Sequence, residues 1–170
     1  MPMLIQLTTD YSIEEDRLCL TGRHETVCVY KLWLTRRLAD RLFYTSVDWL
    51  QKQQQTTHVR SNLVQTFEQE HAIAEIEPQT LVSAPTESSS STWLVNNVDL
   101  CNKKGGGLVL VFKDAQDQDA SVAFETIELR QWLSICCKVY QAAGWPLEIW
   151  PSWMVNDPVA TTSTIETLVH

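Results

Sequence analysis

The sequence predicts an α+β protein built from two β-meander-plus-helix units with a helical connection between them. Runs of β-branched, aromatic and aliphatic residues separated by turn residues occur twice along the 170-residue chain. Each series of runs is followed by a segment whose apolar residues recur with helical spacing. The stretch between the two series contains neither Gly nor Pro from residue 23 to residue 77, which favours helix there.

The first unit, residues 1–76, begins with the strand pattern. Strand-like runs fill residues 3–7, 17–21 and 26–34, and the turn-like residues 22–25 separate the last two runs. The period of two in strands then predicts one apolar face, made of Leu18, Leu20, Val27, Val29 and Trp33.

A helix is expected from about residue 35 to residue 55, with Thr35 as its N-cap. Its apolar stripe contains Leu38, Leu42, Phe43, Ser46, Val47, Trp49 and Leu50. A second helical stripe follows, made of Val59, Leu63, Phe67, His71 and Ala74. One helix of about 40 residues would span about 60 Å, which is long for a body of this size, so we expect two helices with a break near residues 56 and 57.

Residues 77–92 contain two prolines and a run of four serines, the composition of a flexible linker. The second unit, residues 93–155, repeats the strand pattern at 93–101, 108–113 and 121–124. A helix capped by Thr126 follows and ends at Gly144 and Pro146. We expect residues 156–170 to form a disordered tail.

The two units align at a constant offset of 91 residues. Leu18 falls on Val109, Trp33 on Phe124, and Thr35, Leu38 and Leu42 fall on Thr126, Leu129 and Leu133. Few of the aligned residues are identical. The agreement is therefore compatible with an internal repeat and equally with two unrelated meanders that each precede a helix.

Composition and charge narrow the class of protein. The chain is 44% apolar and carries a net charge of −8, which is typical of a folded acidic protein. No apolar run approaches the ~18 residues of a membrane span, and the N-terminus lacks signal-peptide features. We therefore expect a cytoplasmic protein with no membrane partner. Residues 1–60 carry eight basic and seven acidic residues and the remainder five and fourteen, which disfavours nucleic acid as a partner.

No metal or cofactor is expected. The five cysteines show no CxxC spacing, and the four histidines are not spaced as zinc ligands with them or with each other. A hairpin loop at Arg23 and His24 would place Cys19 opposite Cys28 as a redox pair, whereas a loop at Gly22 and Arg23 would separate them. We favour buried thiols that serve in packing, and a buried, hydrogen-bonded His71.

Two turns resemble ligand-binding loops only superficially. The sequence 103–107, Lys-Lys-Gly-Gly-Gly, has its lysines before the glycines and a strand after them, whereas a phosphate loop has the reverse order and leads into a helix. The acidic residues Asp114, Asp117 and Asp119 lack the Gly and distal Glu of a calcium loop. We interpret the first segment as a hairpin turn and the second as a solvated turn.

Two segments are candidates for binding. Arg36, Arg37 and Arg41 form the basic cluster at the start of the first helix, an anion-binding or nucleic-acid-binding site in one interpretation and an ordinary charged surface in the other. Residues 144–154 contain three tryptophans and two prolines. Trp145, Trp150 and Trp153 are either packed on the protein's own core or exposed as a protein-binding surface.

The sequence as a whole predicts a non-catalytic interaction or structural protein that self-associates as a homodimer or binds another protein. An enzyme whose site is assembled in space is the alternative, since no catalytic motif is visible in the sequence. A nucleic-acid accessory factor that uses the Arg36, Arg37 and Arg41 face is the second alternative.

Overall fold

The computed structural model describes residues 1–24, 28–53, 62–75 and 89–155. The elements, in chain order, are β1 (Ile5–Ser12), β2 (Arg17–His24), β3 (Cys28–Thr35), α1 (Arg36–Gln53), α2 (Asn62–Ala74), β4 (Ser89–Leu94), β5 (Asn97–Asn102), β6 (Leu108–Lys113), β7 (Asp119–Phe124), α3 (Thr126–Ala143) and α4 (Ser152–Val155). The α+β class is thereby confirmed. No helix in the described ranges is long and apolar enough to span a membrane.

The strands form two sheets, with the orders β1-β2-β3-β4 and β5-β6-β7. Both three-strand meanders are antiparallel, and β4 joins the first sheet parallel to β3. The sheets are connected at two places. Val95 donates its backbone N–H to Trp33 of one sheet, and Asn96 donates to Lys113 of the other, while the N-terminal segment pairs with β7 through Leu4 and Ser121.

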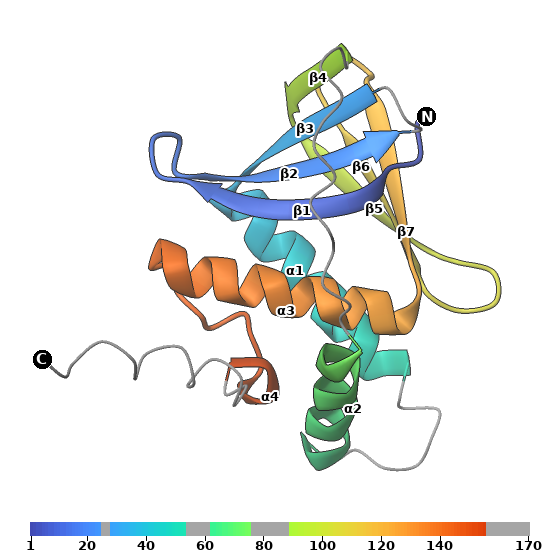
Figure 1. The fold of residues 1–170 in the computed structure, drawn as a ribbon, viewed down its shortest axis with the longest axis vertical. Coiled ribbons are helices and arrows are strands. Elements are labelled where there is room, and N and C mark those ends of the chain that lie inside the picture. Colours follow the sequence, from blue (N-terminus) through green and yellow to red (C-terminus); the bar gives the residue numbers. More distant parts are fainter. Residues whose placement is uncertain (25–27, 54–61, 76–88, 156–170) are drawn as a thin grey trace, which may run out of the picture.

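The helices pack below the sheets in the view of Figure 1, with α3 running across under β1. Thr35 caps α1, because its Oγ1 accepts from the N–H of Leu38 at 3.4 Å. Glu125, not the predicted Thr126, is the N-cap of α3 and forms a capping box with Glu128. Gly144 closes α3 in the left-handed conformation at φ 68°, as the sequence predicted.

The core lies between the sheets and the helices. Aliphatic side chains of β2, β3 and β6 meet the buried faces of α1 and α3 there. An aromatic group fills the space between α1, α3 and the segment that follows α3. Phe43 lies 5.6 Å from Tyr140 and 5.3 Å from Trp150, and Trp132 stacks on Phe124 at 5.0 Å between ring centroids. Such contacts add to the free energy of burial.

The predicted register of the first hairpin is wrong. His24 pairs with Cys28, Leu18 with Leu34 and Cys19 with Trp33. This register differs from the predicted one by an odd number of residues. Trp33 therefore lies on the opposite face of the sheet from Leu18, whereas the prediction placed both on the same face. Cys19 and Cys28 are not opposed, and no disulfide joins them.

Residues 89–101 also differ from prediction. The single strand expected over 93–101 is two strands, because Val95 and Asn96 carry the chain from one sheet to the other. Residues 89–92, which were assigned to the end of the linker, belong to β4 and pair with residues 28–31 of β3. The last strand begins at Asp119 rather than at residue 121, and the first extends to Ser12.

Helix α2 turns the opposite face to the core from the one predicted. Phe67 of the expected apolar stripe is 69% exposed, and His71 is exposed beside Glu75. The buried positions are Gln65, Gln69 and Ala72. The reason lies in α3, whose buried Arg130 is contacted by polar side chains of α2.

Several predictions fall on residues 54–61, 76–88 and 156–170, which lie outside the described residues. They are the break near residues 56 and 57, most of the linker and the tail. In Figure 1, α1 and α2 run in different directions, so the described parts are two helices. The starts of β2 and β3, at Arg17 and Cys28, precede those of β6 and β7 by 91 residues. Two meanders of equal dimensions would give the same agreement, so a duplication stays a prediction.

Candidate binding groove

A groove with a volume of about 340 Å³ lies where β1, β7 and the first half of α3 meet. Figure 1 shows β1 starting beside β7 and running away from it above α3. Eight of the eleven lining residues are apolar, but polar atoms make up slightly more than half of the exposed lining surface. The walls are formed by Leu4, Ile5, Gln6, Leu7, Val122, Ala123, Phe124, Glu128, Gln131, Trp132 and Ile135.

A bulge at the start of β1 opens this groove. Ile5 pairs with Arg23 and the next paired residue is Thr8, opposite Thr21, so the register shifts between them. Gln6, within the bulge, has φ 53°, a left-handed conformation that costs free energy for a non-glycine residue. The bulge turns β1 away from β7, and the groove occupies the gap.

Exposed apolar side chains line the groove on both sides. Ile5 of β1 is 53% exposed and Ile135 of α3 is 41% exposed. Its floor is rigid. The indole of Trp132 is buried against Phe124, and its Nε1 donates to Thr9 Oγ1 at 3.0 Å. A fixed apolar floor between exposed apolar side chains is the arrangement of a binding groove rather than of a loosely packed core.

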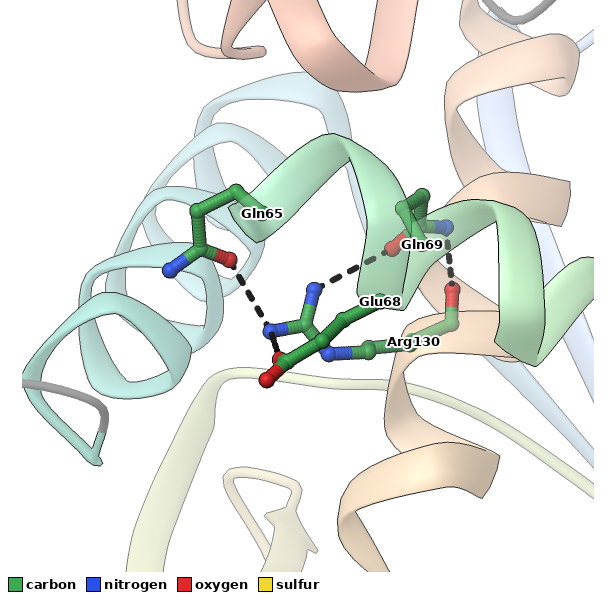
Figure 2. Close-up of polar contacts among 4 residues, drawn as sticks. All are labelled: Gln65, Glu68, Gln69 and Arg130. Atoms are coloured by element: carbon green, nitrogen blue, oxygen red, sulfur yellow. Dashed lines mark hydrogen bonds and ion pairs between the residues drawn. The ribbon is translucent and has the colours of Figure 1, made fainter. Parts of the chain in front are cut away.

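Helix α2 supports the α3 wall from outside the groove. Gln131 lines the groove and donates its Nε2 to the carbonyl oxygen of Ala72 at 2.9 Å. The adjacent residue, Arg130, is 2% exposed, and its guanidinium contacts side chains of α2 (Figure 2). We call Arg130 with Gln65, Glu68 and Gln69 the Arg130 clamp.

The clamp supplies acceptors to the two terminal nitrogens of the guanidinium, whereas the buried Nε of Arg130 has no hydrogen-bond partner among the described residues. Arg130 Nη2 donates to Gln65 Oε1 at 2.9 Å and to Glu68 Oε2 at 2.8 Å, and Nη1 donates to Gln69 Oε1 at 3.5 Å. Gln69 returns a bond from its Nε2 to the Arg130 carbonyl at 3.1 Å. Burial lowers the pKa of Arg130, and the neighbouring Glu68 charge acts against that shift. The guanidinium also lies 5.6 Å from the Trp153 ring centroid, a cation–π contact with α4.

A second polar network lies at the far end of α3. Tyr11 donates its hydroxyl to Asp16 Oδ1 at 2.7 Å, and Trp145 Nε1 donates to the same oxygen at 3.0 Å. Tyr140 donates to Asp40 at 2.9 Å. The pKa of Asp16 is lowered, chiefly by the Tyr11 hydrogen bond, while burial raises the pKa of Tyr140. The pKa values of the Tyr11 and Tyr140 hydroxyls are both raised, which disfavours their ionisation near neutral pH. The two hydrogen bonds to Asp16 are suited to holding the β1–β2 turn.

We expect Asp16→Asn to weaken the pH dependence of stability on the acid side. The folded-state pKa of Asp16 lies below its ordinary value of 3.8. Its contribution to stability is therefore complete well above pH 3.8 and disappears as the pH falls through the folded-state value. Urea midpoints measured at neutral pH and near pH 3 should differ less for Asp16→Asn than for the wild type. The control is Asp10→Asn, an exposed carboxylate on β1, and an equal change in both variants would contradict the assignment.

The three tryptophans predicted as a protein-binding surface are buried. Trp145, Trp150 and Trp153 are each no more than 6% exposed and belong to the hydrophobic core. Trp145 packs on Tyr11 and Tyr140, and Trp150 on Phe43 and Tyr140. Of the two interpretations, packing on the protein's own core is the arrangement observed, and Trp145 contacts Tyr11 of strand β1 as well as helix α3.

The predicted basic cluster is divided by an ion pair. Arg36 Nε lies 3.8 Å from Asp40 Oδ2, so part of its charge is offset. Arg37 and Arg41 are exposed on α1. The structure therefore places the three arginines within the first two turns of α1, with the acidic side chain of Asp40 among them.

The other candidate residues serve local structure. Lys103 pairs with Glu125, and the backbone of Lys103 closes the glycine turn by bonding Gly107 and Gly106. Asp114 accepts from the N–H groups of Gln116 and Gln118, as an aspartate in a turn commonly does. Among the described residues, no group of three His, Cys, Asp or Glu side chains is arranged to hold a metal ion.

Sequence reasoning missed both the groove and the Arg130 clamp. A single arginine between apolar positions of a helix, facing a Gln-Glu-Gln set at positions 65, 68 and 69, was the available signal for the clamp. The groove depends on a bulge and on the contact between two distant strands, for which local sequence gives no signal.

Comparisons of the chain with protein-family models, curated proteins and solved structures find no match.

Proposed function

We propose that this protein is a non-catalytic interaction protein that binds another protein through the groove between β1, β7 and α3. The observation that carries this proposal is the exposure of two apolar side chains, Ile5 of β1 and Ile135 of α3, in the lining of one groove. Exposed apolar side chains that flank a concave surface are characteristic of recognition sites. A cytoplasmic location, expected from the sequence, belongs to the same proposal.

The test is selection of peptides from a displayed library of random sequences on the wild-type protein. Selected peptides, made synthetically and labelled, should bind the wild type and lose binding to Ile135→Lys, because the substitution places a charged side chain in the groove. The matched control is Ile127→Lys, on the same helix. Ile127 and Ile135 are both 41% exposed, and only Ile135 lines the groove. Equal loss in both variants, or failure to enrich any peptide, contradicts the proposal.

Self-association remains a second part of the proposal. It is not assigned to Trp145, Trp150 or Trp153, because their burial leaves little of each ring for a partner. Exposed aromatic side chains on the predicted 35–75 helices support it instead. They are Tyr44 of α1 and Phe67 of α2.

Light scattering at micromolar concentration should give the mass of a dimer for the wild type. Joint replacement of Tyr44 and Phe67 by Ala should reduce this mass, since both side chains are exposed and the fold does not depend on them. The control is Trp150→Phe, which changes a buried ring and leaves the surface intact. A monomeric wild type removes self-association without affecting the groove.

The alternative of an enzyme has its strongest candidate in the hydrogen-bonded pair of Asp40 and Tyr140, where the pKa of the Tyr140 hydroxyl is shifted away from the range of an active nucleophile or base. The nucleic-acid alternative depends on Arg37 and Arg41 beside the Arg36–Asp40 pair. We therefore rank both below protein binding.

A further inference from the structure

The N-terminal segment shows how an extended chain binds the outer edge of β7. Ser121 donates its backbone N–H to the Pro2 carbonyl at 2.9 Å, and Leu4 donates its N–H to the Ser121 carbonyl at 2.7 Å. These two bonds form one parallel bridge between Met3 and Ser121. No further β1–β7 bridge follows within the described residues, because the bulge at Gln6 turns the chain away.

The next position along this edge, Ala123, is directed into the groove. In an antiparallel pair, residues alternate between bonding the neighbouring strand and pointing away from it. Ser121 uses its N–H and C=O on the outer side, so Ala123, two residues later in the β6–β7 ladder, presents both groups on that side as well. Ala123 and Phe124 form part of the groove wall. The edge therefore presents one donor and one acceptor beside apolar side chains of the groove.

We propose that an extended segment of a partner protein adds to the edge of β7 at Ala123, with apolar side chains in the groove and a basic residue near Glu128. This inference rests on the proposed function and specifies the class of partner. An extended backbone satisfies the N–H and the C=O of one residue together, as in recognition by strand addition. Glu128 is the only ionisable side chain among the described residues of the lining, and the whole chain has a net charge of −8, so charge complementarity favours a cationic segment.

A second copy of the chain fits this groove less well. Two copies related by a two-fold axis present the same surface to each other, so a concave groove would face a concave groove and neither would be filled. The contact would also bring two Glu128 carboxylates together within a dimer of two acidic chains. A helix would not supply free backbone groups for Ala123. The occupant is therefore an extended segment of another protein.

The test uses a peptide enriched from the random displayed library on the wild-type protein, N-methylated at one position at a time. Methylation of the one amide that donates to the Ala123 carbonyl should lower affinity by roughly twofold to tenfold, the value of one main-chain hydrogen bond. Methylation at the alternate positions should have a smaller effect, because those amides point away from β7. Equal sensitivity at all positions, or at none, overturns strand addition.

Two variants of the protein give independent evidence. Ala123→Pro removes the N–H that faces the groove without removing a β6–β7 hydrogen bond, since proline is accepted in an edge strand where its missing N–H faces outward. It should weaken peptide binding by a similar factor while circular dichroism stays unchanged. Should Ala123→Pro fail to fold, the N-methyl series alone decides.

Glu128→Gln removes the charge and keeps a side chain able to complete the capping box. It should weaken binding of the peptide and make the remaining affinity less dependent on salt. Unchanged affinity and salt dependence in Glu128→Gln would overturn the basic-residue part of the proposal. If Ile135→Lys abolishes binding but neither the methyl series nor Ala123→Pro does, groove binding stands and strand addition falls. If no peptide binds the wild type, both fall together.

Discussion

Leu133→Ala is expected to lower the free energy of unfolding by roughly 2–5 kcal/mol. Leu133 is completely buried in the core near the middle of α3, and α3 contacts α1, α2, α4, β1 and β7. Removal of its isobutyl group leaves a cavity that elements fixed on several sides cannot collapse to fill. Urea denaturation followed by tryptophan fluorescence measures the loss.

Ile135→Ala is the matched control, since it removes a similar amount of hydrocarbon from a position two residues further along the same helix. Ile135 is 41% exposed, so its replacement should cost at most about 1 kcal/mol. The same contrast should hold on α1, where buried Leu42 and exposed Arg41 are neighbours. Similar losses for Leu133→Ala and Ile135→Ala would mean that α3 turns a different face to the core.

The sequence was sufficient to predict those elements in which the apolar periodicity and the capping residues indicate the same helix. On α1, Thr35 and the stripe that includes Leu42 and Phe43 indicated both the start of the helix and its buried face. The end of α3 at Gly144 was predictable for a similar reason, because a residue with φ 68° at a helix terminus favours glycine. In both cases a local preference and the tertiary structure require the same residue.

The sequence failed where packing overrides local preference. In the first hairpin, apolar residues on both faces allowed several loop positions, and the observed register is the one that buries Leu18, Leu20, Leu32 and Leu34 together. In α2, the Phe67 stripe predicted a conventional amphipathic helix. The buried charge of Arg130 reverses that orientation, because an unsolvated guanidinium costs more free energy than an exposed phenyl ring.

The groove could not be predicted from the sequence, because it depends on how strands that are distant in the sequence are arranged in space. Its two β walls come from segments that lie far apart in the sequence, Ile5 in β1 and Ala123 in β7. The bulge that separates them is centred on Gln6, a residue type with no special preference for positive φ. A site of this kind forms where one strand turns away from another, so the pairing of the strands in space must be known before the site can be located. The composition alone predicted only an interaction protein.

The Arg130 clamp gives the other prediction of large effect. Arg130→Met should lower the free energy of unfolding by roughly 2–5 kcal/mol, since it removes a buried charge while leaving its acceptors in place. Gln69, which is 2% exposed, loses the donor to its Oε1, and Gln65 loses the Nη2 bond. Glu68 is 43% exposed on its side chain, so water can solvate it and its share of the loss should be small.

A combined variant separates the polar contacts of the clamp from its contribution to packing. In Arg130→Met with Gln65→Leu and Gln69→Leu, the buried acceptors are replaced together with their donor, so much of the stability lost in Arg130→Met should return. The control is Lys138→Met, an exposed cation on α3, which should change stability by no more than about 0.5 kcal/mol. Hydrogen exchange provides the local measurement: amides of α2 should lose protection in Arg130→Met before those of α1, because the clamp joins α2 to α3. A stable Arg130→Met variant with full protection in α2 would show that apolar contacts, rather than the guanidinium, hold this helix and the supported wall of the groove.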